Sequence, residues 1–441
     1  MQADSDYRLW VREMQDMGEE LKQVRTHEVI GTLNKGIGRL EQEATAEQIA
    51  GRGWNLLRED LSLPAAVLYG DKMEHNLRWM QGFINRYEMK LAPHGKTTMA
   101  PKLFDMQLEG GAWGITLATA HQVQVAYAHG VRRVLMANQL VGKRNMEIVA
   151  EMIADPEFEF YCVVDSALNV DQLATHFRER GLRLKVLVEL GVPGGRCGVR
   201  DDSQLKDVLD ALDRSRGVVD LCGAELYEGV LKDEGSIRSF LRRACELTRH
   251  LLMEGRFART PALISGAGSA WYDVVAEEFA AAGFGDAVEI ILRPGCYLTH
   301  DVGNYETQQQ RILKSNPIAR EMRSGLVPAL HIWAYVQSIP EPELAVMGMG
   351  RRDAAFDSGL PKPAVHYRPG SAGPQNVPAH WETTKLMDQH GYLKIAPADD
   401  VRVGDMIGFD ISHPCLTFDK WRVLAVVDDK FDVVDVVKTY F

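Results

Sequence analysis

One lysine in the sequence stands where it could act as a covalent catalyst. The stretch LAPHGKTTMAP, residues 91–101, leads from a short apolar run through Pro93 and His94 to Lys96, which two threonines follow. A lysine amine can form an imine with an aldehyde or ketone. A lysine just past a strand can equally be a solvated loop charge, so the role of Lys96 depends on what surrounds it.

Two glycine-containing segments could bind an anion. SGAGS occupies residues 265–269 and RPGCY occupies residues 293–297, and each directly follows a strand-like run. A glycine-rich turn lets backbone N–H groups approach an anion without interference from Cβ atoms. Alone, each segment could be an ordinary turn. Together, at the ends of neighbouring strands, they predict a phosphate site.

A histidine and a cysteine two residues apart could share a metal ion. ISHPCLTFDKW contains His413 and Cys415, in a predicted strand or strand-edge turn. On an extended chain residues i and i+2 face the same side, so one cation could take both side chains. Imidazole and thiolate together suit zinc, and two protein ligands leave positions for water or substrate. From the spacing alone, the pair could also be core or surface residues.

The elements that must position these residues are eight β-rich runs alternating with amphipathic helical segments. This is the count of a (β/α)8 TIM barrel, an α/β fold. Helical segments such as NVDQLATHFRERG end in glycine, which favours helix termination. The expected strands are 89–93, 112–116, 132–137, 158–165, 183–190, 219–226, 261–266 and 288–293.

The pattern of predicted secondary structure changes after about residue 320. Strand-like runs there are separated by Pro, Gly and Asp turns, and helical periodicity is scarce. We expect an N-terminal helical leader at 1–62, a barrel at 63–315 and a C-terminal all-β domain at 316–441. The run LPAAVLYG, residues 63–70, could pack on the β domain instead of the barrel.

In a (β/α)8 barrel the chemistry lies at the C-terminal ends of the strands. Lys96 follows the first expected strand, Asn138 the third, Arg196 the fifth and Tyr227 the sixth. Asp165 follows the fourth, where it could cap the next helix. The loops after strands 7 and 8 are where barrels most often hold a phosphate. A lysine and a phosphate site at one barrel mouth suggest pyridoxal phosphate, which acts as an electron sink.

Composition narrows the functional classes. The 441 residues include 46% apolar and 25% charged residues, and the net charge is -11. These values predict a globular protein that binds neither nucleic acid nor membrane. The charged N-terminus lacks the apolar segment of a signal peptide, and the six cysteines are scattered, so we expect a cytoplasmic protein with reduced thiols. Cysteines other than Cys415 are expected to be core thiols.

The segments PHGKTTMAPKL, GGRCGVR, GAELYEG, SGAGS and RPGCYLTHD together resemble the fold-type III pyridoxal-phosphate enzymes, the alanine-racemase-like group. Within it, residues 60–440 look most like the D-serine dehydratase and D-threonine aldolase branch. The resemblance implies that Lys96 carries the cofactor, that Arg196 pairs with its pyridine nitrogen, and that Tyr227 lies near the ring. It also implies phosphate contacts from Ser265, Gly266, Gly268, Gly295 and Tyr297. His94, two residues before Lys96, could contact the cofactor or be structural, and Asn138 could contact the cofactor or pack the barrel mouth.

Two residues depart from the family pattern. Gly95 stands where relatives often have a bulkier residue, and Glu225 stands where they often have glutamine.

An arginine at the pyridine nitrogen would keep the ring unprotonated and favour reactions that need modest carbanion stabilisation. The D-serine dehydratase branch uses a His-x-Cys pair for zinc, which maps onto His413 and Cys415, although another divalent cation could serve. The aldolase branch tends to have His and Asp there, so Cys415 favours elimination.

The expected activity is therefore that of a lyase that eliminates water from D-serine or a related D-3-hydroxy amino acid, giving a 2-oxo acid and ammonia. The alternatives are a D-threonine-type aldolase, an amino-acid racemase, and a non-catalytic cofactor carrier. The resemblance also implies a homodimer with the active site near the interface. Asp357, in the glycine-rich segment 348–361, is a further candidate for a residue near the site.

Overall fold

The computed structural model describes residues 28–441, which form two compact units. The barrel unit comprises Gln81–Lys96 and Phe104–Gly295. The β unit comprises residues 28–80, Thr97–Leu103 and Cys296–Phe441. Both units are discontinuous in sequence.

The barrel unit is built on one curled sheet of eight strands in the order β2-β9-β8-β7-β6-β5-β4-β3, and every pairing is parallel. This confirms the predicted α/β barrel. The strands are β2 Lys90–Leu91, β3 Ile115–Leu117, β4 Arg133–Gln139, β5 Glu159–Val164, β6 Leu184–Leu190, β7 Val219–Leu226, β8 Ala262–Gly266 and β9 Val288–Leu292.

Short backbone contacts join the two end strands. The N–H of Trp113 donates to the carbonyl of Leu91 at 2.7 Å, and the N–H of Thr116 donates to the carbonyl of Pro93 at 2.8 Å. A parallel bridge also pairs His94 with Thr116. These contacts place the segment that carries Lys96 beside β3, at the carboxyl end of β2.

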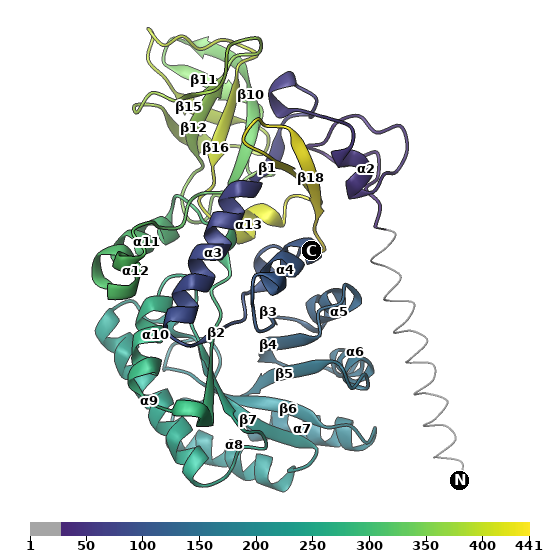
Figure 1. Ribbon diagram of the computed structural model, residues 1–441, viewed down its shortest axis with the longest axis vertical. Coiled ribbons are helices and arrows are strands. Elements are labelled where there is room, and N and C mark those ends of the chain that lie inside the picture. The colour runs from purple at the N-terminus through teal and green to yellow at the C-terminus, as the bar shows by residue number, and fades with distance from the viewer. Residues whose placement is uncertain (1–27) are drawn as a thin grey trace. The chain divides into compact units, whose positions relative to one another are not determined.

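Helices connect the strands and cover the outer face of the sheet (Figure 1). Four begin at a side chain that accepts a backbone N–H, as helix N-caps do: Thr119, Ser166, Asp201 and Asp233. The helices are α5 Ala120–Ala128, α6 Lys143–Ile153, α7 Ala167–Arg178, α8 Asp202–Arg214, α9 Glu234–Met253 and α10 Tyr272–Ala281. The helices α3 Gly70–Arg86 and α4 Pro101–Glu109 contribute residues to both units.

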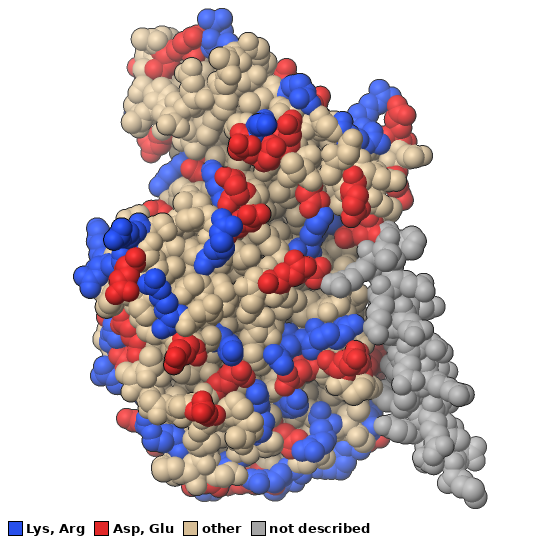
Figure 2. All heavy atoms as spheres, in the orientation of Figure 1, with Lys and Arg blue, Asp and Glu red and all other residues tan. Residues whose placement is uncertain are grey.

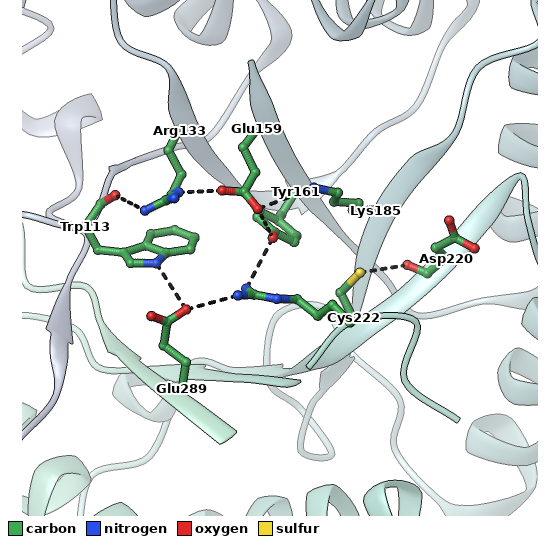
Figure 3. Close-up of polar contacts among 9 residues, drawn as sticks. Trp113, Arg133, Glu159, Tyr161, Lys185, Asp220, Cys222 and Glu289 are labelled. Atoms are coloured by element: carbon green, nitrogen blue, oxygen red, sulfur yellow. Dashed lines mark hydrogen bonds and ion pairs between the residues drawn. The ribbon is translucent and has the colours of Figure 1, made fainter. Parts of the chain in front are cut away.

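The amino ends of the barrel strands carry a network of charged and aromatic side chains (Figure 3). Glu159 accepts hydrogen bonds from Arg133, Lys185 and the Tyr161 hydroxyl. Burial alone would raise the pKa of Glu159, but the bonds from Tyr161 and Arg133 outweigh it and lower the pKa to about 2. Glu159 is therefore ionised at neutral pH and ties β4, β5 and β6 together.

The β unit contains a ten-stranded sheet whose main path runs β13-β12-β16-β10-β1-β17-β18, and β11, β15 and β14 extend it from β10. The strands are β1 Ala65–Tyr69, β10 Leu330–Glu341, β11 Leu344–Met347, β12 Lys362–Tyr367, β13 Gln375–Asn376, β14 Glu382–Leu386, β15 Gly391–Lys394, β16 Met406–Asp410, β17 Val423–Val427 and β18 Val433–Lys438. Its helices are α2 Ala46–Ala50, α11 Asn304–Ser315, α12 Pro317–Glu321 and α13 Cys415–Phe418.

The segment preceding the barrel belongs to this β unit. Strand β1 lies between β10 and β17, and all five of its residues are buried. The Tyr69 hydroxyl lies 3.0 Å from His331 Nδ1 and accepts a bond from Trp333 Nε1 at 3.0 Å. The range 63–315 expected for the barrel therefore begins with a strand of the other sheet. The alternation of β and α segments does not reveal which sheet a strand joins.

The expected helical leader at 1–62 lies partly outside the described residues. Within residues 28–62 the helical segments are α2 and the short turn Leu56–Arg58, so this described part is mostly irregular. Its apolar side chains, including Ile49 and Leu56, pack into the core of the β unit. The physical reason is burial of these side chains against the sheet, which does not require helical periodicity.

On the face that Figure 2 shows, basic and acidic side chains are interspersed. Among residues 28–441, no helix is both long and apolar enough to cross a membrane.

Candidate active site and metal pair

Lys96 lies in a short 3-10 turn, Gly95–Thr97, directly after the β2 segment, and its side chain is exposed. Gly95 explains how the turn fits against the barrel. A Cβ atom there would lie 2.7 Å from Ile115 Cγ2 and 2.8 Å from Phe104 Cε1, closer than packing allows. The bulkier residue that relatives often carry at this position would therefore require these neighbours to move.

A chain of charged and polar groups lies beside Lys96 in the barrel. His94 Nε2 is 3.4 Å from a terminal nitrogen of Arg293, and the other terminal nitrogen of Arg293 bonds Glu225 and the carbonyl of Leu226. Burial, together with Arg293 and Lys96, holds the pKa of His94 well below its usual range. His94 is therefore a neutral imidazole at neutral pH.

Three buried polar atoms of this group of side chains have no hydrogen-bond partner among residues 28–441: His94 Nδ1, Arg293 Nε and Glu225 Oε2. Each such atom costs free energy unless a ligand or water bonds it. Their grouping beside the predicted catalytic lysine is the pattern expected of a site that receives a polar ligand.

Two further carboxylates carry raised pKa values. Burial, reinforced by Glu225, raises the pKa of Glu189 to about 8. Glu225 lies opposite Glu189 in the paired strands β6 and β7, and burial raises its pKa also. Because two negative charges on directly paired strand residues repel each other, at least one of the two carboxyl groups holds a proton near neutral pH.

Arg196 and Tyr227 lie together at the same end of the barrel. The Arg196 guanidinium is 4.4 Å from the centre of the Tyr227 ring, a distance typical of cation–π contacts. Arg196 also acts electrostatically on His94 and Glu189, so it lies near both. The structure thus brings together Lys96, His94, Arg196 and Tyr227, four of the residues predicted from the sequence.

The SGAGS turn follows β8, as predicted, and a buried glutamate occupies part of it. Glu228 accepts the N–H of Ala267 at 3.1 Å and the N–H of Gly268 at 2.7 Å. Burial raises the pKa of Glu228. A Cβ on Gly268 would lie 3.0 Å from Tyr227 Cε2, so this glycine permits the close approach of the ring. These two N–H groups already have a carboxyl acceptor in the structure.

The other predicted cofactor residues make local contacts. The Ser265 hydroxyl donates to the carbonyl of Ile291 at 3.1 Å, and Gly266 accepts the N–H of Arg293 at 3.1 Å. Gly295 donates its N–H to the Ser269 hydroxyl oxygen at 3.1 Å. Asn138 is exposed and donates to the carbonyl of Ala118 at 3.1 Å. Tyr297 is buried in the β unit.

Asp165 does not cap the helix that follows it, contrary to the expectation. Ser166 is the cap of α7, and it accepts the N–H of Asn169. Asp165 instead accepts the N–H of Gly198 at 2.9 Å, which anchors the loop that carries Arg196. Ligand atoms of Asp165, Glu189 and Cys197 lie within 4.8 Å of one another.

His413 and Cys415 lie in the β unit, in a turn rather than on a strand. Strand β16 ends at Asp410, and Cys415 is the first residue of α13. Pro414 has helical dihedrals and no N–H to donate, so an extended ladder cannot continue through it. The expectation of extended geometry is therefore wrong, yet the two side chains still meet. Their hydrogen bond raises the pKa of His413 to about 9.

Three further residues surround this pair within the β unit. The Cys415 sulfur lies 3.7 Å from that of Cys296 and 3.4 Å from Thr97 Oγ1. The contact with Cys296, joined by that with His413, lowers the pKa of Cys415 well below its usual range. Asp357 Oδ2 lies 2.7 Å from His413 Nδ1, which leaves Nε2 of the ring for another partner. The candidate Asp357 is thus joined to the predicted metal pair.

The residues fit the groups predicted from the sequence. Lys96 supplies an amine for an aldehyde cofactor, and the unpaired buried atoms of His94, Arg293 and Glu225 supply polar contacts for a ligand. A thiolate-favouring cysteine beside an imidazole suits a soft divalent metal. A carboxylate bonded to the histidine fixes which ring nitrogen is available, as in many metal sites.

Sequence reasoning missed Arg293, Glu228 and Cys296 as site residues. Arg293 was visible as the first residue of RPGCY, and Glu228 follows Tyr227 directly. Cys296 gave no local signal, because its contact with Cys415 joins positions 119 residues apart.

Two segments of the chain match known protein families. Residues 69–287 match the alanine racemase N-terminal domain, and residues 329–427 match the serine dehydratase domain family. A D-threonine aldolase from Arthrobacter sp. is 27% identical over 375 residues, covering 83% of this chain and 89% of the relative. D-threo-3-hydroxyaspartate dehydratase from Delftia sp. (strain HT23) is 30% identical over 146 residues, covering 33% of this chain and 38% of the relative.

Among solved structures, D-threonine aldolase from Filomicrobium marinum aligns with a TM-score of 0.72 and 23% identity, covering 88% of this chain and 97% of that one. This likeness shows the fold, and the curated relatives are lyases. The chain therefore belongs to the fold-type III family of pyridoxal-phosphate enzymes, with an alanine racemase N-terminal domain followed by a D-serine dehydratase-like domain.

Proposed function

We propose that this chain is a pyridoxal-phosphate- and zinc-dependent lyase that eliminates water from D-serine or a related D-3-hydroxy amino acid. The products would be a 2-oxo acid and ammonia. The observation that carries the proposal is the exposed Lys96 amine at the end of β2, two residues after His94, whose pKa Lys96, Arg293 and Arg196 all lower. Relatives with dehydratase and aldolase names support the class of substrate.

Lys96 has two tasks in this proposal. Its Nζ would hold the aldehyde of the cofactor, and as a free amine it would accept the α-proton of the substrate. When bound, pyridoxal phosphate supplies an electron sink for the charge that develops at Cα. Arg196 would pair with the pyridine nitrogen of the cofactor, and Tyr227, against which Arg196 packs, would limit the movement of the guanidinium.

We assign the neutral His94 and the buried Glu225–Arg293 pair to the same site as Lys96. A neutral imidazole can donate one hydrogen bond and accept another without adding charge beside the lysine. We assign His94, Glu225 and Arg293 to contacts with the cofactor. The same assignment covers Asn138 and five residues near the ends of β8 and β9: Ser265, Gly266, Gly268, Gly295 and Tyr297. Because Ala267 and Gly268 already donate to Glu228, other donors of the loops after β8 and β9 are assigned to the phosphate.

His413 and Cys415 are the residues that would hold the metal, which supplies Lewis-acid activation of the substrate β-hydroxyl. Cys415 contacts Thr97, and Thr97 is the residue that follows Lys96 in the chain.

An aldolase is the second candidate. The similarity to D-threonine aldolase extends over 83% of this chain, and the same lysine and metal could serve carbon–carbon cleavage. In that reaction the β-hydroxyl loses its proton, and the Cα–Cβ bond breaks to give glycine and an aldehyde. The two reactions break different bonds of a D-3-hydroxy amino acid, so their products differ.

Product identification separates the two candidates. The protein is incubated with D-serine, D-threonine and D-threo-3-hydroxyaspartate, each paired with its L enantiomer, and products are identified by mass spectrometry. A 2-oxo acid with equimolar ammonia supports elimination, and glycine with an aldehyde supports the aldolase. If no substrate is consumed while cofactor remains bound, the lyase proposal is wrong and the carrier reading stands.

Variants test the two sites separately. Lys96→Ala should lower activity by about a thousand-fold or more, because the proton acceptor is lost. Lys90→Ala, which removes another exposed lysine of the same segment, should leave activity near that of the wild type.

EDTA should abolish turnover and zinc should restore it; chelator-resistant turnover would exclude the metal role. Sedimentation analysis of the same preparation tests the expected homodimer.

A further inference from the structure

A third soft metal ligand lies beside His413 and Cys415. Cys296 begins the short turn Cys296–Leu298, which follows the RPG segment, and its side chain is 4% exposed. Its sulfur is 3.7 Å from that of Cys415, although the two residues are 119 positions apart in the chain. All six cysteines of the chain are thiols in the structure.

The sulfur–sulfur distance is informative. Two thiolates that each lie about 2.3 Å from one zinc ion, at a tetrahedral angle, are about 3.8 Å apart. A disulfide requires about 2.05 Å. The observed 3.7 Å therefore matches two ligands of one ion and is too long for a covalent bond.

The chemistry of the surroundings favours the same conclusion. His413 bonds Cys415, and its Nδ1 is held by Asp357 at 2.7 Å, so Nε2 remains as the ligand atom. Two thiolates and one imidazole give a set with a formal charge of about -2, which neutralises a divalent ion. Soft sulfur ligands favour zinc over magnesium, calcium or manganese.

We propose that Cys296 is a third protein ligand, so that Cys296, His413 and Cys415 hold one zinc ion and leave a fourth position open. Three protein ligands and one open position are typical of catalytic zinc sites. The inference rests on the proposed metal site and deepens it, because it adds a third ligand to the proposed pair and explains why a buried thiol lies at this turn.

The test counts sulfur ligands and does not depend on turnover. The full-length protein with its cofactor is stripped of metal by a chelator and titrated with Co(II), whose charge-transfer absorption reports bound thiolates. Cys296→Ser should retain a metal-binding response with about half of the thiolate band, since one of two thiolates is removed. Its zinc affinity should fall about 10- to 100-fold or more.

Matched variants make the test specific. Cys245→Ser alters another buried thiol, in α9 of the barrel unit, and should leave the band unchanged. Cys415→Ser should also lose about half of the band. X-ray absorption of the zinc form should count two sulfurs in the wild type and one in Cys296→Ser. Circular dichroism on each variant verifies that it is folded.

The outcomes separate two failures. A Cys296→Ser protein with the wild-type band and one zinc–sulfur bond in both forms would overturn the role of Cys296 and leave the two-residue metal site intact. A wild-type protein that binds neither Co(II) nor zinc would overturn the metal site itself. An intact mass showing a Cys296–Cys415 disulfide in zinc-saturated protein would overturn shared coordination.

Discussion

At the residue scale, the site is distinguished by charged groups buried without full pairing. Glu225 and Arg293 pair inside the barrel, yet each retains one buried atom without a partner among residues 28–441, and so does His94. Such atoms destabilise the fold unless they serve a ligand, so their grouping near Lys96 is more informative than any one of them.

Glu228 provides a test at this scale. Its carboxylate accepts two backbone N–H groups of the turn after β8, and Glu228→Gln leaves one of them facing an amide NH2 group. We expect the turn to shift and the apparent affinity for pyridoxal phosphate to fall about tenfold or more, equivalent to ~1.4 kcal/mol. Titration of the apoprotein followed by cofactor absorbance measures this. The control is Glu109→Gln, on the exposed surface of α4, and equal affinities in both variants would contradict a positioning role.

At the element scale, the amino ends of β4, β5 and β6 are joined through Glu159 (Figure 3). Its folded pKa of about 2 lies below the ordinary value of 4.5, so the folded state binds fewer protons and the stabilisation disappears as pH falls through this window. Glu159→Gln should lower the free energy of unfolding by about 1–3 kcal/mol at pH 7. The difference in stability between wild type and variant should vanish as the pH falls to the folded pKa of Glu159. Urea unfolding across pH measures it. A gap that persists in acid would show that the effect is not electrostatic.

Strand β1 offers a second test at this scale. Leu68 is fully buried at the centre of the β-unit sheet, so Leu68→Ala should cost about 2–5 kcal/mol. Leu33, in the same N-terminal segment, is 98% exposed, and Leu33→Ala should change stability by about 0.5 kcal/mol or less. Equal midpoints in urea unfolding would mean that β1 contributes little to the sheet.

The sequence predicted the eight barrel strands to within a few residues, because buried parallel strands alternate with amphipathic helices and both patterns are local. It could not assign β1 to a sheet, because strand partners are long-range contacts. The same limit applies in the site. Lys96, Arg196 and Tyr227 lay at predictable strand ends, whereas the contacts of Cys296 with Cys415 and of Glu228 with the turn at 267–268 join residues that are distant in sequence.

At the scale of the whole molecule, the two units are interleaved along the chain. The β unit is assembled from residues 28–80, Thr97–Leu103 and Cys296–Phe441, so its sheet cannot form from the C-terminal segment alone. Without β1, strands β10 and β17 would each expose an edge that the folded sheet pairs.

A fragment comparison tests this dependence. Residues 296–441 expressed alone should lack a cooperative unfolding transition and should aggregate, because the missing β1 also removes Val67, Leu68 and Tyr69 from the core. Linking residues 28–80 to the same fragment should restore strand signal in circular dichroism and raise the unfolding midpoint. The same linked fragment carrying Leu68→Asp is the control, since it supplies the chain without an apolar side chain at that position. If the C-terminal fragment folds cooperatively by itself, β1 is an accessory strand and the N-terminal segment serves another purpose.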